Sequence, residues 1–120
     1  PMQLVRGDAV EAVGDLVAQL PAHAAAVVTT TWVVAYFSRE QRAGFRDALA
    51  AASHARPIVW ISAEGQGVVD SIPSAGVPSD ANGVEWSVLG RVMFAGGDAD
   101  SELLGYVHPH GSALDWRASP

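Results

Sequence analysis

Polar side chains that could bind or transform a ligand stand directly after two apolar runs of this sequence. The first run, "AAAVVTTTWV", carries three successive threonines that end at Thr31, and Trp32 follows them. The second run, "PIVWISA", is followed at once by Glu64 and a glycine. A charged group at such a place is seldom there for packing, and a carboxylate can serve as a general base or hold a hydroxyl group. Glu64 is therefore our first candidate for a catalytic residue, with Thr31 and Trp32 as candidates for substrate contact.

Two histidines, His108 and His110, flank a proline near the end of the sequence. Imidazole is suited to proton transfer near neutral pH and to metal binding. The chain contains no cysteine, and no third ligand stands at a spacing typical of a metal site. We therefore expect no metal ion here, and we interpret both histidines as strand-end groups that line a pocket and belong to a catalytic site.

Each candidate also has a structural interpretation that requires no ligand. Asp8 stands at the start of a segment with helical spacing, where a carboxylate caps a helix. Threonines at a strand end can simply favour β structure, and a tryptophan can serve a core or an interface. Glu64 can instead be a solvent-exposed loop carboxylate. If Glu64 contacts a ligand, we expect replacement by glutamine to leave folding intact and to weaken ligand binding, whereas substantial unfolding would show a structural role. The sequence alone leaves these alternatives open.

The candidates are positioned by alternating elements that the apolar spacing predicts. Valines at helical spacing follow Asp8, and Ser38 and Gln41 form a capping box before a second helix. The predicted order is a strand at 3–6, a helix at 8–20, a strand at 24–33, a helix at 38–53 and a strand at 57–63. This order implies parallel strands joined by right-handed crossovers. Ligands bind beyond the carboxyl ends of such strands, which is where the polar clusters stand.

The second half of the sequence is of a different kind. Residues 65–84 are rich in glycine and proline, which predicts a long irregular loop, and such loops are often functional lids or mobile segments. Residues 84–94 and 102–110 are apolar segments on either side of a Gly-Gly-Asp turn, which predicts an antiparallel hairpin. The predicted fold is α/β, with parallel strands followed by this C-terminal hairpin.

Composition restricts the classes of partner. The 120 residues are 49% hydrophobic, enough for one domain with a core, and the net charge is −6 with no lysine. Broad binding to a phosphate backbone needs clustered cations, so we expect no nucleic acid partner; the arginines at 39, 42 and 46 are interpreted as a solvated helix face. No run reaches about 18 apolar residues and no signal pattern opens the chain. We therefore expect no membrane contact and a soluble, cytoplasmic protein.

The segments "VRGDAVEAVGDL", "AAAVVTTTWVVAYFSREQRAGF" and "IVWISAEG" together resemble the second half of a class I S-adenosylmethionine-dependent methyltransferase. More narrowly, "WISAEG" with "HPHG" resembles the C-terminal third of the bacterial family called domain of unknown function 2332. The resemblance covers nearly all of the chain. It implies a partial Rossmann-like (methyltransferase-like) three-layer sheet, S-adenosylmethionine as cofactor with Asp8 near its adenine amino group, and a small molecule as methyl acceptor.

The chain departs from the methyltransferase pattern at the Gly-rich cofactor loop, which is missing together with the first two strands of that fold. We therefore expect residues 1–120 to be a single domain that forms the C-terminal part of a larger methyltransferase-like domain. In the methyltransferase strand order, the strand at 24–30 pairs with an absent strand and leaves an open apolar edge. Open edges recruit partners, so we expect a homo-oligomer or pairing with the upstream half. A non-catalytic α/β interaction module is the alternative to an enzyme.

Overall fold

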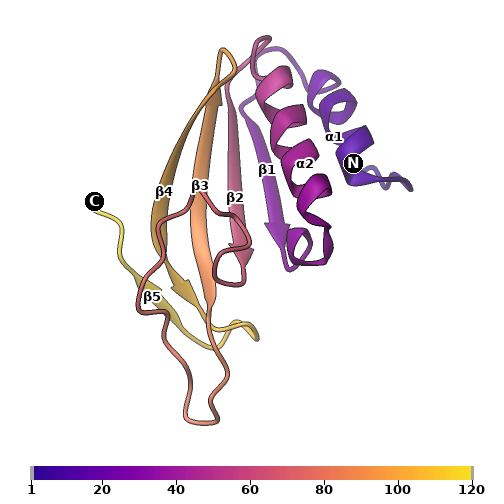
Figure 1. Cartoon of the computed structure of the whole chain (residues 1–120). Coiled ribbons are helices and arrows are strands. Elements are labelled where there is room, and N and C mark those ends of the chain that lie inside the picture. The colour runs from indigo at the N-terminus through magenta and orange to yellow at the C-terminus, as the bar shows by residue number, and fades with distance from the viewer. Residues whose placement is uncertain (1, 120) are drawn as a thin grey trace.

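Residues 2–119 are described by a computed structural model, shown in Figure 1. Helices come first and strands dominate the second half of the chain. In chain order the elements are α1 (Ala9–Ala18), β1 (Ala26–Thr31), the short 3-10 helix η1 (Val34–Tyr36), α2 (Arg39–Ala52), β2 (Ile58–Glu64), β3 (Ser87–Ala95), β4 (Asp98–Val107) and β5 (Leu114–Trp116).

The five strands form one mixed sheet in the order β1-β2-β3-β4-β5. β1 and β2 are parallel, with Ala26 beside Ile58 and Thr31 beside Ala63, while every later pair is antiparallel. The prediction of an α/β fold with parallel strands followed by an antiparallel hairpin is therefore confirmed. The parallel pair is joined through η1 and α2, which returns the chain to the start of β2.

Both helices begin at caps that the sequence predicts. The Asp8 carboxylate accepts a hydrogen bond from the Val10 N–H at 2.7 Å. Before α2, the Ser38 hydroxyl accepts from the Gln41 N–H at 3.1 Å, and the Gln41 side chain accepts from the Ser38 N–H at 2.8 Å. These bonds satisfy N–H groups that have no partner within the helix, so each helix starts at a defined residue.

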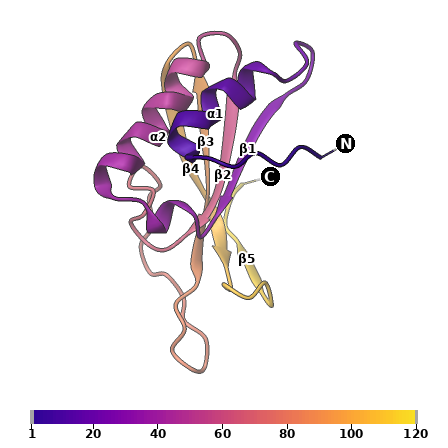
Figure 2. The same ribbon diagram turned by 90° about the vertical axis from the view of Figure 1, so that its right-hand side faces the viewer.

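The helices lie on one side of the sheet, as Figures 1 and 2 show. Alternate residues of β2 that face the helices are buried, whereas Val59, Ile61 and Ala63 on the other face are half-buried and Val27 of β1 is 54% exposed. Residues 2–119 thus form two layers, and the predicted third layer is not among them. A right-handed crossover places α2 on one face, and α1 packs beside α2 rather than on the opposite face.

The predicted strand at residues 3–6 is wrong. The segment runs as irregular chain before α1, and the Leu4 side chain is 94% exposed. Its apolar residues have strand propensity, but a strand forms only where another strand satisfies its backbone groups. β1 therefore lies at one edge of the sheet, and its outer side pairs with no strand among residues 2–119.

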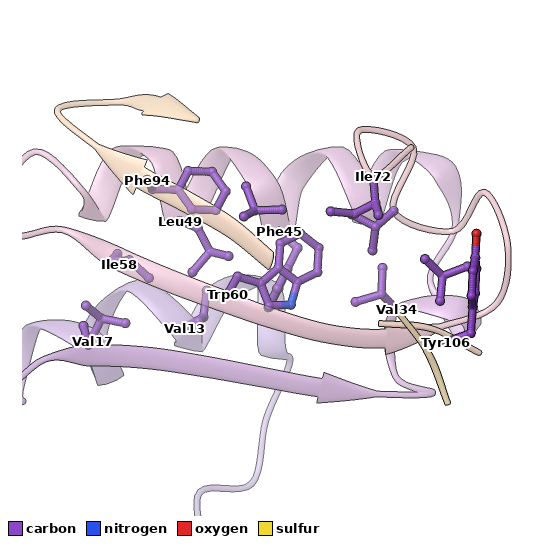
Figure 3. Close-up of a cluster of buried hydrophobic side chains, with 14 residues drawn as sticks. Val13, Val17, Val34, Phe45, Leu49, Ile58, Trp60, Ile72, Phe94 and Tyr106 are labelled. Atoms are coloured by element: carbon purple, nitrogen blue, oxygen red, sulfur yellow. The ribbon is translucent and has the colours of Figure 1, made fainter. Parts of the chain in front are cut away.

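The core lies between the sheet and its helical layer, as Figure 3 shows for Phe45, Trp60 and their neighbours. The rings of Phe45 and Trp60 meet edge to face, with centroids 5.4 Å apart. The Trp60 indole N–H donates to the Thr30 hydroxyl at 3.0 Å. The middle threonine of the run is therefore a buried acceptor, while Thr29 and Thr31 point to the exposed side of β1.

The long loop between β2 and β3 covers the helix-facing side of the sheet beyond α2. It carries no helix or regular strand, as predicted, apart from an isolated bridge between Ser79 and Glu85. Ile72 is buried against Gly90, where an added Cβ would come within 2.7 Å of the isoleucine. The Tyr106 hydroxyl also donates to the loop at the Ala75 carbonyl, 3.0 Å away. This part of the loop therefore packs against the sheet through Ile72 and the contact with Tyr106.

β5 was not predicted from the sequence. It is three residues long and pairs with the end of β4, where Gly105 lies against it. A Cβ at Gly105 would lie 2.2 Å from the Asp115 carbonyl oxygen, so only glycine permits this approach.

Among the helices of residues 2–119, none has the length and apolar character that crossing a membrane requires.

Candidate functional site

Glu64 closes β2 and is 1% exposed, so it is not a solvent-exposed loop carboxylate. Its two carboxylate oxygens accept hydrogen bonds from the N–H groups of Val33, at 3.2 Å, and Ala35, at 3.0 Å. Val33 is the N-terminal cap residue of η1 and Ala35 lies within η1. The buried charge is thereby solvated by backbone dipoles instead of water, and it joins the end of β2 to the β1 crossover.

Arg42 holds the same turn from the other side. Its guanidinium donates from Nε to the Val34 carbonyl and from Nη2 to the Ala35 carbonyl, each at 3.2 Å. Glu64 therefore takes N–H groups of the η1 region and Arg42 takes its carbonyls. We call this pair of side chains the η1 clamp.

Trp32 lies in the left-handed region of backbone space, with φ of 51°. For a bulky residue this conformation costs about 1 to 3 kcal/mol, and it persists where the surroundings enforce it. Here the Trp32 N–H donates to the Ala63 carbonyl at 3.1 Å and the indole N–H donates to the Ser87 hydroxyl at 2.8 Å. The ring lies over Gly65, and it stays 39% exposed.

Thr31 and Trp32 therefore lie together at the carboxyl end of β1, as the sequence predicts. Thr31 is exposed and alternates to the face that carries no helix. The Trp32 indole reaches across the end of β2 to the first residue of β3. A cavity of about 10 Å³ lies next to Glu64, which is room for one water molecule at most. An organic substrate has no access to the Glu64 carboxylate in this conformation.

A larger cleft opens between α2 and the first residues of the long loop. It has a volume of about 370 Å³ and is lined by Val34, Arg39, Arg42, Ala43, Arg46, Trp60, Gly67, Val68, Val69 and Asp70. The sequence interpretation of the three arginines as a solvated face is wrong for two of them, since Arg42 and Arg46 are half-buried in the cleft. The position of these arginines on α2, the helix that follows the carboxyl end of β1, could have indicated that they lie near a binding cleft.

Asp8 lies at the N-terminus of α1, away from the lining of this cleft. Its carboxylate is occupied by the Val10 N–H, which gives the capping alternative a definite contact. A role near adenine remains a prediction.

His108 and His110 belong to a second polar group, at the end of β4. The His108 Nε2 lies 2.8 Å from a carboxylate oxygen of Asp80, and its Nδ1 accepts from the His110 N–H at 3.2 Å. These contacts indicate the neutral tautomer with the proton on Nε2. The other Asp80 oxygen accepts the N–H groups of Asn82 and Val84, at 2.8 and 2.9 Å.

The hydrogen bond from His108, aided by that from the Val84 N–H, holds the pKa of the Asp80 carboxyl below its usual value. Asp80 escaped the sequence analysis because it stands in the glycine-rich loop with no neighbouring motif. The Asp80 and His108 pair lies at the same end of the sheet as Glu64, but β3 separates β2 from β4. The structure thus makes two polar groups where the sequence analysis placed one.

Among residues 2–119, no group of three or more potential metal ligands is placed to hold an ion.

A family model described as "Uncharacterized protein conserved in bacteria (DUF2332)" matches residues 1–116. The chain belongs to the DUF2332 family. The comparisons with curated proteins and with solved structures each gave no significant match. The description of the DUF2332 family names no reaction or ligand, so a function for this DUF2332 chain has to be argued from its geometry.

Proposed function

We propose that this DUF2332 domain binds a small molecule on the surface formed by Thr31 and Trp32, at the carboxyl end of the parallel strands. The observation that supports it is the left-handed backbone of Trp32, which keeps an indole ring part-exposed there. Enforced left-handed residues of this kind cluster at ligand sites. Parallel α/β sheets also bind ligands at this end.

Each neighbouring group has a role in this proposal. The Ser87 hydroxyl and Gly65 fix the plane of the indole, whose open face can stack on a planar ligand. The exposed Thr31 hydroxyl supplies a hydrogen bond beside it. Glu64 acts as a positioning residue, because it holds the N–H groups that follow Trp32 and does not reach the surface itself.

The narrower form of the proposal is methyl transfer from S-adenosylmethionine to a small molecule. It is supported by the sequence resemblance and by the candidate groups that lie at the edge of the sheet where β1, β2 and β4 end. In this form Asp8 lies near the adenine, and His108 and His110 are polar groups of the acceptor site. The Asp80 contact gives His108 a defined tautomer, as a proton-transfer group requires.

A calorimetric titration of S-adenosylhomocysteine into the natural full-length protein tests the proposal. We expect saturable binding that is lost in Trp32→Leu and kept in Trp116→Leu, since Trp116 is also exposed but lies on β5. Thermal unfolding of both variants shows whether the fold survives. Absence of binding at millimolar ligand contradicts the methyltransferase form. Equal loss in both variants contradicts the Trp32 surface.

The second candidate function is a non-catalytic interaction module, and the edge strand β1 supports it. β1 has the sequence "AVVTTT", without the charge or proline that commonly protects an edge, and its Val27 is 54% exposed. Light scattering on the full-length protein decides this candidate. A concentration-dependent dimer that Val27→Lys abolishes supports it, and a monomer at all concentrations contradicts it.

A further inference from the structure

Three arginines line one side of the cleft beside α2. Arg39, Arg42 and Arg46 follow one another at intervals of three and four residues, which places them on one face of the helix. The chain carries only seven cations among 120 residues and a net charge of −6. A concentration of positive charge at one cleft is therefore a local feature that opposes the charge of the whole protein.

These arginines have no carboxylate partner among residues 2–119. The arginine ion pairs of the described chain instead join Arg91 to Glu102 and Arg117 to Asp115. Arg42 uses two of its nitrogens for the η1 clamp. The cleft also contains one acidic residue, Asp70, which is exposed at its rim. Arg46 is half-buried and Arg39 is exposed. Guanidinium groups that line a cleft without a counter-ion favour an anion that reaches them.

The remaining walls of the cleft are apolar. Val34, Trp60 and Val69 are buried residues that contribute to its lining. A volume of about 370 Å³ falls within the range of small-molecule sites, which combine apolar walls with a few polar groups. The cleft thus offers an apolar wall and a cationic wall to the same ligand.

We propose that this cleft binds a small organic oxyanion, either a phosphate ester or a carboxylate, that carries an apolar body. Arg39 and Arg46 hold its oxygen atoms, since the planar guanidinium matches both groups with two parallel N–H donors. The apolar body lies against Val68 and the edge of Trp60. The site is distinct from the Trp32 surface, because neither Thr31 nor Trp32 lines the cleft.

Phenyl phosphate is the probe that fits this proposal, because it joins a dianionic phosphate to an apolar ring. We expect saturable calorimetric binding to the natural full-length protein that weakens as sodium chloride is added. Arg46→Gln should weaken it about tenfold or more, the effect of losing one charge-assisted hydrogen bond. Arg6→Gln is the matched control, since it removes the same charge from an exposed residue before α1.

Related probes separate the two ligand chemistries and the two proposed sites. Benzoate in place of phenyl phosphate shows whether a carboxylate or a phosphate is preferred, and benzyl alcohol, which has the ring without the charge, should bind far more weakly. Trp32→Leu should leave phenyl phosphate binding unchanged even if it abolishes S-adenosylhomocysteine binding. Absence of saturable binding by both anions, or equal weakening by Arg6→Gln and Arg46→Gln, overturns the proposal.

Discussion

The buried carboxylate beside the short segment η1 and the arginines of the neighbouring cleft differ in whether the chain itself supplies their partners. The Glu64 carboxylate is buried and both of its oxygens are taken by backbone N–H groups. Arg39 and Arg46 line the cleft beside α2, and neither arginine has a carboxylate partner among residues 2–119. Arg42 shares features of both: it donates hydrogen bonds to two backbone carbonyls, and it also lines the cleft.

The difference teaches how to separate a structural charge from one available to a ligand. A buried ion has to recover the solvation it loses, and Glu64 does so within the chain. Its position after an apolar strand suggested catalysis, which remains a prediction, and its contacts give it a definite part in the fold. A half-buried cation at a cleft keeps part of its hydration and retains free donors, so it is the better candidate for binding.

Phe45→Ala tests whether both regions depend on one core. Phe45 is 2% exposed and packs on Trp60, which also lines the cleft. We expect a loss of about 3 to 5 kcal/mol in the free energy of unfolding, measured by urea denaturation. Tyr36→Ala, at an exposed aromatic residue of η1, is the control and should change little. A loss near zero for Phe45→Ala would show that this face of α2 is assigned wrongly.

Glu64→Gln tests the structural half of the contrast. Glutamine has one carbonyl oxygen, which can accept from only one of the two positions held by the Val33 and Ala35 N–H groups. Its NH₂ group then points at the other N–H, and two donors cannot form a hydrogen bond. We expect the free energy of unfolding to fall by about 2 to 3 kcal/mol, in place of the intact folding expected from the sequence. Glu40→Gln, on the exposed first turn of α2, should stay within about 0.5 kcal/mol. Equal stability of the two variants would return Glu64 to the list of ligand-binding candidates.

Arg42→Gln and Arg46→Gln test the contrast within one helix face. Arg42→Gln removes two hydrogen bonds to η1 carbonyls and should reduce the free energy of unfolding by about 1 to 2 kcal/mol. Arg46→Gln should remain within about 0.5 kcal/mol of the natural protein. The measurement is urea denaturation of both variants without ligand. If Arg46→Gln destabilises as much as Arg42→Gln, then the cleft arginines are part of the fold.

The pair of Asp80 and His108 extends the contrast to the other polar group and should give the smallest effect. Because the pKa of Asp80 is lowered in the folded chain, its contribution to stability is present above the unfolded pKa of 3.8 and is lost as the pH falls through the lower folded value. Asp80→Asn should therefore flatten the acid limb of stability against pH.

Urea denaturation between about pH 6 and pH 3 measures this limb. Asp47→Asn is the control, at an exposed carboxylate on α2. An unchanged acid limb in Asp80→Asn would show that the contact with His108 contributes nothing to stability in solution.

Much of the fold was predictable because the relevant signals are local. Asp8 and the pair Ser38 and Gln41 contact residues two or three positions away, so their caps follow from short spacing. The hairpin turn between β3 and β4 is equally local. The segment 3–6 had the same apolar character as a strand, but the strand that would pair with it lies nowhere in residues 2–119.

The candidate site was predictable only in outline. The order of elements placed Thr31, Trp32 and Glu64 at one end of the sheet, and the structure keeps them there. What each side chain does there was decided by partners far away in the chain. Glu64 is satisfied by residues 31 and 29 positions earlier, and Trp32 is oriented by Ser87, 55 positions later.

By itself the sequence determined the two helices, the parallel strands β1 and β2 and the C-terminal hairpin, because spacing, capping and turn signals act within a few residues. Strand pairing decided that residues 3–6 form no strand and that β5 does. The tertiary structure alone decided that Glu64 is buried with a hydrogen bond to each carboxylate oxygen, that Asp80 contacts His108, and that three arginines share a cleft with Trp60. Charges find their partners, or fail to find them, only when distant segments are brought together. A pattern of neighbours along the chain does not contain that information.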